Sequence, residues 1–446
     1  MRETRNAQAS IFDFYCKHEQ GVLLKSLSDL LDEHSCILNL IEQNFDKPNV
    51  AHTGACGLSL ESIFRCMLLK KILKVSYRKL AFHLCDSPTF RCFARLREGQ
   101  TPGHSTLQAT IRRVSPQTIE RINQLLMAQW VVQDKLSIDT LRIDSTVVQS
   151  NILSPRDSQL LDDGVRVLSR LMAQSRQRTG VKLRFCDQRK RSKSLAFRLF
   201  HAKKTEKEAL YPTLLRCVGT TLRQIGKACD KVKLEACDAQ PVTAWIQEVQ
   251  HYRSLLLRVV DQTQRRVFND EKVPAAEKIV SLFEPHTDII VKGQRDVMYG
   301  HKINLATQRD GFVTYLNIEH GNPSDKILYL PVLEACHEDY GQLPVATVAD
   351  GGYASQANVE QARTSGVKQS VFNKPVGLGL HQMGVKRKTF ESLKKFRAGI
   401  EGNISELKRA FDMAKATWKG HEGFKAYVWS SVLSYNLIRM IRFSSA

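Results

Sequence analysis

Strand-like sequence occurs in two separate parts of this chain, with a long helical stretch between them. Residues 136–148, LSIDTLRIDSTVV, alternate polar and apolar positions and are rich in β-branched side chains, which predicts a strand ending near Asp144. Residues 154–280 then show helical spacing and many Arg and Lys residues. The strand pattern returns at Asp288. A sheet built from both parts must therefore accommodate a helical insertion after its first strand.

The second part predicts strands and helices in alternation. The expected order is a hairpin with its turn at residues 309–311, a helix to about Tyr340, a strand ending at Asp350, a helix closed by Gly366, a strand at 367–373 and a final helix. Asp325 is expected to be an N-cap, with a supporting role near a site as the alternative. Together with the first strand, this order predicts an α/β fold in which helices flank a mixed sheet.

The N-terminal region, residues 1–135, predicts short helices joined by tight turns. Ser76, Ser87 and Ser115 are expected N-caps. Arg112 and Arg113 favour a helix-turn-helix-like region that contacts DNA, and a helical assembly module is the alternative. The predicted organisation is a helical N-terminal DNA-binding domain at 1–135, a catalytic core at 136–153 and 281–446, and a basic helical insertion at 154–280.

The charge of the chain indicates a polyanionic partner. Lys and Arg total 66 against 45 Asp and Glu, a formal net charge of +21. Such an excess most often serves nucleic-acid binding, and a solvated basic surface is the alternative. The eleven cysteines include no CxxC pair, which is typical of reduced thiols. No signal peptide or membrane span is predicted, so we expect a cytoplasmic, nucleoid-associated protein.

Three acids are placed to act together. Asp144 and Asp350 follow strands expected to be neighbours, and chemistry gathers at the carboxyl ends of such strands. Glu401 lies in the segment FRAGIEGNISELKR, on one helical stripe with Arg397 and Lys408. Carboxylates are hard ligands, so two Mg²⁺ or Mn²⁺ ions held about 4 Å apart would suit phosphoryl displacement. A strand-end cap, a turn aspartate and a surface ion pair are the alternative readings of these three residues.

Other residues near these acids have expected roles of their own. Arg397 and Lys408 are expected to offset phosphate charge, and Lys302 is a candidate phosphate contact. Glu406 is expected to point away from Glu401. Glu284, His286 and Asp288 could resemble a metal site, but they are expected to form a hydrogen-bond cluster where a strand begins. Trp418 and Trp429 are both expected in the core.

The motifs together resemble a known family. The segments IDSTVV, FEPHTDIIVKGQ, GHK, DGGY and RAGIEGNISELKR are similar to those of the DDE transposases of bacterial insertion sequences, most of all the ISNCY-type members. The resemblance extends from the helical N-terminal region to WKGHEGFKAYVWSSVLSYNL. It implies a ribonuclease H-like core in which Asp144, Asp350 and Glu401 form the DDE triad. It also implies a metal-dependent transposase acting at terminal inverted repeats.

The resemblance carries further expectations and two departures. The partners would be double-stranded DNA, as element ends and target, and a second copy of the chain, because two ends must be paired. Related families often place a tyrosine where this chain has Lys394. Many relatives carry their insertion between the second aspartate and the glutamate, whereas the longer gap here separates the two aspartates. An endonuclease that does not join DNA, or a non-catalytic DNA-binding relative, are the alternatives.

Overall fold

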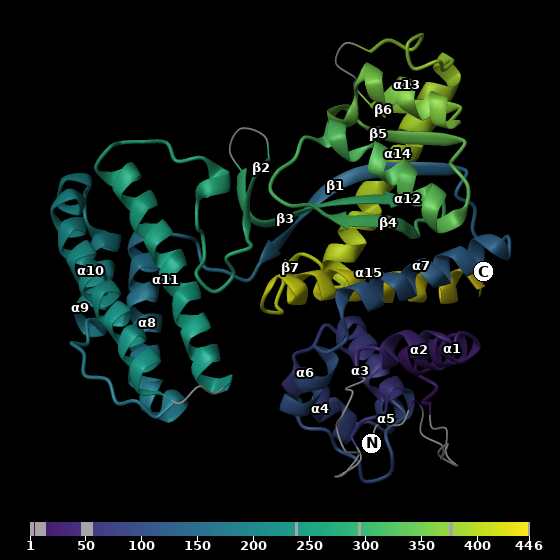
Figure 1. Ribbon diagram of the computed structural model, residues 1–446. Helices are drawn as coiled ribbons and strands as arrows, with labels where there is room; N and C mark the ends of the chain where they lie inside the picture. The colour runs from purple at the N-terminus through teal and green to yellow at the C-terminus, as the bar shows by residue number, and fades with distance from the viewer. Residues whose placement is uncertain are drawn as a thin grey trace. The chain divides into compact units, whose positions relative to one another are not determined.

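The computed structural model describes residue 4 and residues 15–45, 57–236, 240–292, 296–373 and 378–444. The chain divides into two compact units (Figure 1). The first contains Met1–Gln149 and His301–Ala446, and the second contains Ser150–Gly300. The second unit is therefore an insertion in the sequence of the first.

The N-terminal region, residues 1–135, forms only helices in the part that the structure describes. These helices are α1 (Glu19–Glu33), α2 (Ile37–Glu42), α3 (Leu60–Ile72), α4 (Tyr77–Asp86), α5 (Pro88–Phe93), α6 (His104–Ile111) and α7 (Pro116–Val132). Ser76, Ser87 and Ser115 cap α4, α5 and α7, because each side chain accepts a backbone N–H from the first turn of its helix. The predicted starts of these three helices are confirmed.

A mixed sheet forms the centre of the α/β part. Its strands are β1 (Thr140–Ser150), β2 (Asp288–Lys292), β3 (Asp296–Thr307), β4 (Val313–Ile318), β5 (Ala346–Asp350), β6 (Gln369–Asn373) and β7 (Lys415–Ala416). The order is β2-β3-β1-β5-β6, while β4 pairs with β3 and β7 with β1. β5 runs parallel to β1 and β6, and β3 is antiparallel to β2 and β4. The predicted mixed sheet with a helical N-terminal region is confirmed.

Helices cover both faces of the sheet. The remaining elements of this unit are η2 (Asp325–Leu328), α12 (Leu330–Tyr340), η3 (Gly351–Tyr353), α13 (Gln356–Ser365), α14 (Arg387–Ala410) and α15 (His421–Ser444). Ala349 packs with residues of α12 and α13, whereas Val348 packs with Leu393 of α14. Side chains alternate along a strand, so Asp350 shares the face of Val348. That face is the one covered by α14, the helix that carries Glu401.

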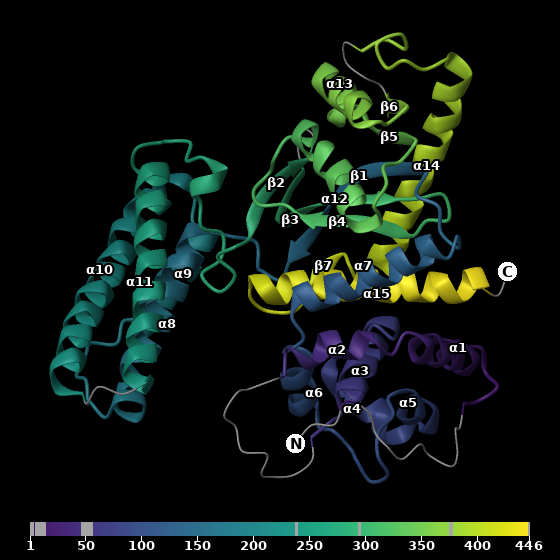
Figure 2. The same cartoon turned by 45° about the vertical axis from the view of Figure 1, so that its right-hand side comes forward.

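Helix α15 connects the N-terminal helices to the sheet. It lies beside α7 in both views (Figures 1 and 2). One hydrophobic cluster contains Leu68 of α3, Ile122 of α7, Val313 of β4 and Leu433 of α15. The helical N-terminal region and the sheet therefore share a core. Trp418 and Trp429 are both buried in this region, as predicted.

The second unit is mainly helical. It contains α8 (Asp157–Thr179), α9 (Arg189–His201), α10 (Lys204–Glu235), α11 (Gln240–Val267) and η1 (Ala275–Glu277). Leu168, Val218 and Leu256 belong to a core cluster of its own, in which the indole N–H of Trp245 donates to the Leu171 carbonyl at 3.0 Å. The predicted helical insertion is confirmed. No helix in the described part of the chain is both long and apolar enough to cross a membrane.

Two local predictions were wrong. β1 does not end near Asp144 but continues to Ser150, because Thr146, Val147 and Val148 sustain the strand pattern and β7 pairs with it. The helix expected after the turn at 322–325 begins as the short 3₁₀ segment η2, and the α-helix starts only at Leu330.

Candidate active site

Asp144 and Asp350 lie on neighbouring parallel strands. β1 and β5 pair in register from Thr140 with Ala346 to Ile143 with Ala349, so the aspartates are the next residue on each strand. Asp144 Oδ1 accepts the backbone N–H of Ser145 at 2.8 Å, which orients the carboxylate. The Asp350 side chain is 51% exposed. The register thus brings the two predicted aspartates together, although Asp144 is inside its strand.

The guanidinium of Arg397 lies between three carboxylates. Its Nη2 is 3.2 Å from Asp144 Oδ2 and 3.6 Å from Asp350 Oδ1, and its Nη1 is 3.4 Å from Glu401 Oε1. The Arg397 side chain is only 10% exposed, whereas that of Glu401 is 69% exposed. Carboxylates from β1, β5 and α14 therefore converge on one buried cation. The four-residue spacing of Arg397 and Glu401 places them on the same side of α14.

The carboxylate cluster suits a divalent metal centre. Its donors are hard oxygen atoms, which Mg²⁺ and Mn²⁺ prefer. Arg397 brings a single positive charge to three acids, so further positive charge would be stabilised there. Asp350 and Glu401 are also open to solvent, which gives an ion access to them. The residues present fit divalent cations, with Asp144, Asp350 and Glu401 as the candidate ligands.

Arg142 anchors α14 to the sheet. Its guanidinium donates to Thr307 Oγ1 at 2.8 Å, to the Phe396 carbonyl at 3.1 Å and to Asn403 Oδ1 at 2.6 Å. A Cβ at Gly399 would lie 2.0 Å from Arg142 Nη1, so only glycine permits this approach. Burial lowers the pKa of Arg142. Arg142 was not predicted to support the site. Its sequence does carry a signal for this role, because it is a charged residue in a buried strand and lies on the same face as Asp144, two positions later.

Glu406 makes different contacts from Glu401. Its carboxylate lies 3.5 Å from Arg439 Nη2 and 3.1 Å from Arg442 Nη1, both on α15. Glu401 instead faces Arg397. The predicted separation of the two glutamates on the helix surface agrees with these contacts.

Asp325 supports the aspartate strands through contacts with three segments. Ser324, not Asp325, occupies the N-cap position of η2, so the expectation of an N-cap is wrong. The Asp325 carboxylate accepts from Ser145 Oγ at 3.2 Å and pairs with Lys302 Nζ at 2.5 Å. A Cβ at Gly352 would lie 2.9 Å from Asp325 Oδ2. One carboxylate therefore links β1, β3 and the turn that follows Asp350.

Lys302 takes part in the contacts of Asp325. The lysine is buried, and its ammonium donates to the Pro323 carbonyl at 2.8 Å besides pairing with Asp325. Its placement does not favour the predicted phosphate contact. Tyr353, in the same turn, is fully buried and donates to Asn304 Oδ1 at 2.8 Å. Burial, reinforced by the nearby acids, raises the pKa of Tyr353, so its hydroxyl stays protonated.

The other residues predicted to contact DNA lie in varied surroundings. Arg112 is exposed at the end of α6, and its Nη2 donates to the Lys419 carbonyl at 2.8 Å. Arg113 is half-buried, with its guanidinium 4.3 Å from the Phe45 ring centroid. Lys408 is half-buried on α14. Their contacts with DNA stay predictions, and the packing of Arg113 indicates a structural role as well.

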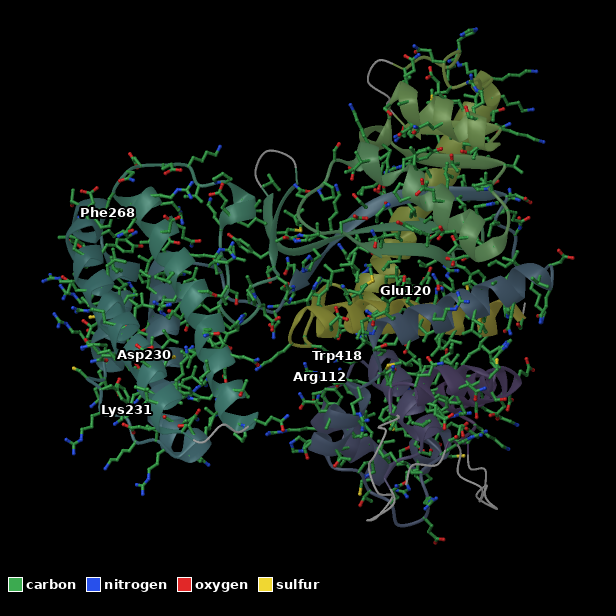
Figure 3. All side chains as sticks on the ribbon, viewed as in Figure 1. Arg112, Glu120, Asp230, Lys231, Phe268 and Trp418 are labelled. Carbon is green, nitrogen blue, oxygen red and sulfur yellow. The ribbon has the colours of Figure 1, made fainter. Side chains whose placement is uncertain are left out.

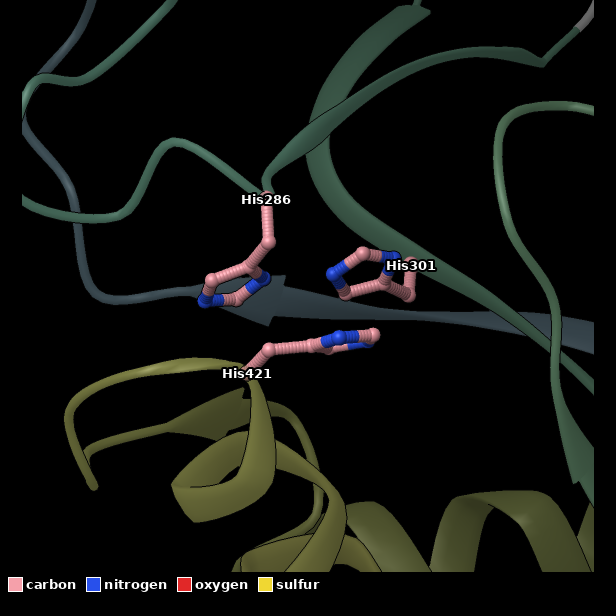
Figure 4. Close-up of side chains that lie close together, drawn as sticks. All are labelled: His286, His301 and His421. Carbon is pink, nitrogen blue, oxygen red and sulfur yellow. The ribbon is translucent and has the colours of Figure 1, made fainter. Parts of the chain in front are cut away.

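Two histidines of the first unit stack on each other. His301 and His421 are drawn in Figure 4, and their ring centroids are 5.2 Å apart. The Phe424 ring meets His301 edge-on at 4.7 Å. His301 thus packs with α15, while its neighbour Lys302 faces Asp325. His286, drawn in the same figure, belongs to the second unit. There its Nε2 lies 2.9 Å from Glu284 Oε2, which agrees with the predicted hydrogen-bond cluster.

Two segments of the chain match models of known protein families. Residues 291–437 match the family model described as the transposase DDE domain, and residues 12–113 match that of the transposase domain (DUF772). No curated protein and no solved structure matches the chain. The DDE-domain match includes Asp350 and Glu401 but begins after Asp144. A transposase DDE domain implies a metal-dependent enzyme of phosphoryl transfer, and both matched segments are similar to transposase domains.

Proposed function

We propose that this protein is the DNA transposase of a bacterial insertion sequence of the ISNCY type. It binds the terminal inverted repeats of the element, cleaves a DNA strand there and joins the freed 3′ end to target DNA. The observation that carries this proposal is the convergence of Asp144, Asp350 and Glu401 on Arg397. The match of residues 291–437 to a transposase DDE domain supports it.

Each group of the site has a defined part in this reaction. Two Mg²⁺ or Mn²⁺ ions, held by the three acids when bound, would activate the attacking oxygen and stabilise the leaving oxygen. Arg397 offsets negative charge among the carboxylates and, once these bind cations, can turn its guanidinium toward a phosphate. Arg142 and Gly399 fix the distance between α14 and β1, and so between Glu401 and the aspartates.

The reaction needs no covalent link between protein and DNA. Water attacks the phosphorus in line, and the bond to the 3′ oxygen breaks to leave a 3′ hydroxyl. This hydroxyl then attacks a phosphorus of the target strand, whose own bond to its 3′ oxygen breaks and leaves a new 3′ hydroxyl on the target. Both steps are the same displacement with different nucleophiles, so one site serves both. Pairing of two element ends requires at least a homodimer, and the helices of the N-terminal region are the proposed end-binding region.

The test uses labelled DNA that carries the element's own ends. The full-length protein is incubated with this DNA in Mg²⁺ or in EDTA, alongside Glu401→Gln and Asp144→Asn. We expect metal-dependent nicking at the ends by the wild type and a loss of at least a thousandfold in both variants, with DNA binding retained. Strand-transfer products would distinguish a transposase from an endonuclease with the same core.

Glu406→Gln is the matched control, because Glu406 lies on the same helix but pairs with α15. It should cleave at close to the wild-type rate. Equal loss in Glu406→Gln and Glu401→Gln would contradict the assignment of Glu401. Binding of the ends without nicking in any divalent metal would contradict the catalytic proposal.

A further inference from the structure

One cavity of the first unit has none of the clustered carboxylates in its lining. It has a volume of about 390 Å³ and is lined by residues of α3, α4, α6 and the segment between β7 and α15. This volume is within the range of small-molecule sites. Its basic lining residues are Lys70, Lys74, Arg112 and Lys419. Asp412 is the only acid among the described lining residues, so the cavity carries excess positive charge. Figure 3 labels Arg112 and Trp418, which lie at this place.

Two buried donors in this cavity lack hydrogen-bond acceptors within the described part of the chain. Trp418 is 6% exposed, and its indole N–H makes no hydrogen bond to the described residues. The hydroxyl of Tyr77 is likewise buried and without a hydrogen-bond partner among them. Lys70 is also only 6% exposed, and its ammonium lies 5.0 Å from the centroid of the Tyr77 ring. Buried donors without acceptors are costly, which points to an acceptor supplied from outside the chain.

The charged groups around the cavity favour an acceptor with negative charge. Burial lowers the pKa of Lys70, and the charge of Asp412 opposes this effect only in part. A bound anion would favour the charged ammonium and stabilise it. Ser76, the N-cap of the ten-residue helix α4, also lines the cavity, so the positive end of the helix dipole is directed there. Lysine, arginine, a helix N-terminus and neutral N–H and O–H donors together are typical of phosphate recognition.

We propose that this cavity binds a phosphate group of a nucleotide, through Lys70, Arg112, Tyr77 and Trp418. Arg112 contributes from the rim, where its other contact with the Lys419 carbonyl holds the guanidinium in place. The cavity is large enough to take the sugar beside the phosphate. A DNA strand is the source of this phosphate if the proposed function is right, and a free nucleotide is the other source. Phosphate recognition itself does not depend on that function.

The experiment uses the full-length protein and its intrinsic fluorescence. Wild type is titrated with inorganic phosphate, a mononucleotide and a short oligonucleotide, and Trp418→Phe shows whether the signal comes from the cavity. Lys70→Met keeps the shape of the side chain and removes its charge, and Arg112→Gln changes an exposed residue that folding should tolerate. Lys25→Gln, an exposed lysine of α1, is the matched control.

We expect Lys70→Met and Arg112→Gln each to weaken binding at least tenfold, and Lys25→Gln to leave it unchanged. An oligonucleotide that binds at least tenfold more tightly than the mononucleotide would support a DNA strand as the source. Equal affinities would overturn that source and support a free nucleotide. Wild-type affinity in both cavity variants, or no signal with any of the three ligands, would overturn the proposal.

A cleavage assay on the same samples separates the two proposals. Lys25→Gln should keep both metal-dependent nicking and binding in the cavity, while Glu401→Gln should lose nicking and keep binding in the cavity. Nicking with no effect of the cavity variants on affinity would overturn this inference alone. Binding that depends on Lys70, without nicking by the wild type, would overturn the proposed function alone.

Discussion

The position of Arg397 explains how three acids can lie close together. Its guanidinium contacts Asp144, Asp350 and Glu401 at 3.2 to 3.6 Å and offsets part of their mutual repulsion. Its Nε is buried and makes no hydrogen bond within the described residues, so this geometry leaves one donor of the side chain unsatisfied. Such a buried, unsatisfied donor is unusual and is consistent with a side chain that changes partner during function.

Replacing Arg397 should therefore strengthen the response of the protein to divalent metal. In EDTA we expect Arg397→Gln to lower the free energy of unfolding by about 1 to 3 kcal/mol, because the carboxylates lose their charged donor. Mg²⁺ should then raise the melting temperature of the variant more than that of the wild type, since ligand binding stabilises the folded state. Thermal unfolding across an Mg²⁺ titration measures both effects.

Arg442→Gln is the matched control for this experiment, because Arg442 pairs with Glu406 and not with the carboxylate cluster. Its Mg²⁺ response should equal that of the wild type. An identical response in Arg397→Gln would show that the ion does not compete with this guanidinium for the three acids.

At the scale of single residues, the sequence predicts the acids better than their supports. Asp144, Asp350 and Glu401 occur in recognisable motifs, and the spacing of Arg397 from Glu401 indicates a shared helix face. Arg142 carries only the weaker signal of a charged residue in a buried strand, and Asp325 was expected to be an N-cap, because the partners of both lie far away in the sequence. The contacts of Arg142 with Thr307 and Asn403 depend on the packing of α14 on β1, which only the folded chain defines.

At the scale of elements, helix α14 positions the third acid. It packs on the face of the sheet that carries Asp350, and Arg142 holds it through the Phe396 carbonyl and Asn403. Asn403 in turn donates to Tyr435 of α15 at 2.8 Å. The helix is thus fixed between the sheet and α15 by polar groups as well as apolar ones. A small shift of α14 would move Glu401 relative to both aspartates.

Two glycines of α14 offer a direct test of this positioning. Gly399→Ala would place its Cβ 2.0 Å from Arg142 Nη1, whereas a Cβ at Gly402 would have nothing within 4 Å. We expect Gly399→Ala to lower stability by about 1 to 3 kcal/mol and to reduce DNA cleavage strongly. Gly402→Ala should be neutral or stabilise the helix by up to about 1 kcal/mol. Thermal unfolding and cleavage rates of both variants measure the contrast, and similar effects at the two sites would contradict it.

Element boundaries were predictable wherever a local side chain defines them. Ser76, Ser87 and Ser115 mark helix starts because each satisfies a backbone N–H of its own first turn. Gly366 closes α13 in a left-handed conformation for a similarly local reason. The end of β1 was not predictable in this way. Besides its β-branched residues, its continuation past Asp144 involves pairing with strands that are distant in the sequence, β3 and the short β7 at Lys415–Ala416.

At the scale of the whole molecule, positive charge is the property that the sequence predicts without the fold. The net charge of +21 indicates a polyanion, but not which surfaces meet it. The structure separates basic residues into different classes. Lys190, Arg191 and Lys193 of α9 are exposed, whereas Arg265 of α11 lies within 3.4 Å of Asp261, Glu271 and Glu277. Only the first class has charge available for phosphate.

This distinction gives a test of whether the second unit contributes to DNA binding. Each phosphate contact that is lost should reduce the slope of log K against log salt by about 0.9 for double-stranded DNA, through reduced counterion release. We therefore expect the triple substitution of Lys190, Arg191 and Lys193 by Gln to flatten this slope and weaken binding at low salt. Arg265→Gln should leave the slope unchanged, because three acids already compensate its charge. Fluorescence anisotropy with labelled duplex DNA between low and physiological salt gives both slopes. An unchanged slope in the triple variant would mean that these three residues of α9 do not contact DNA phosphates.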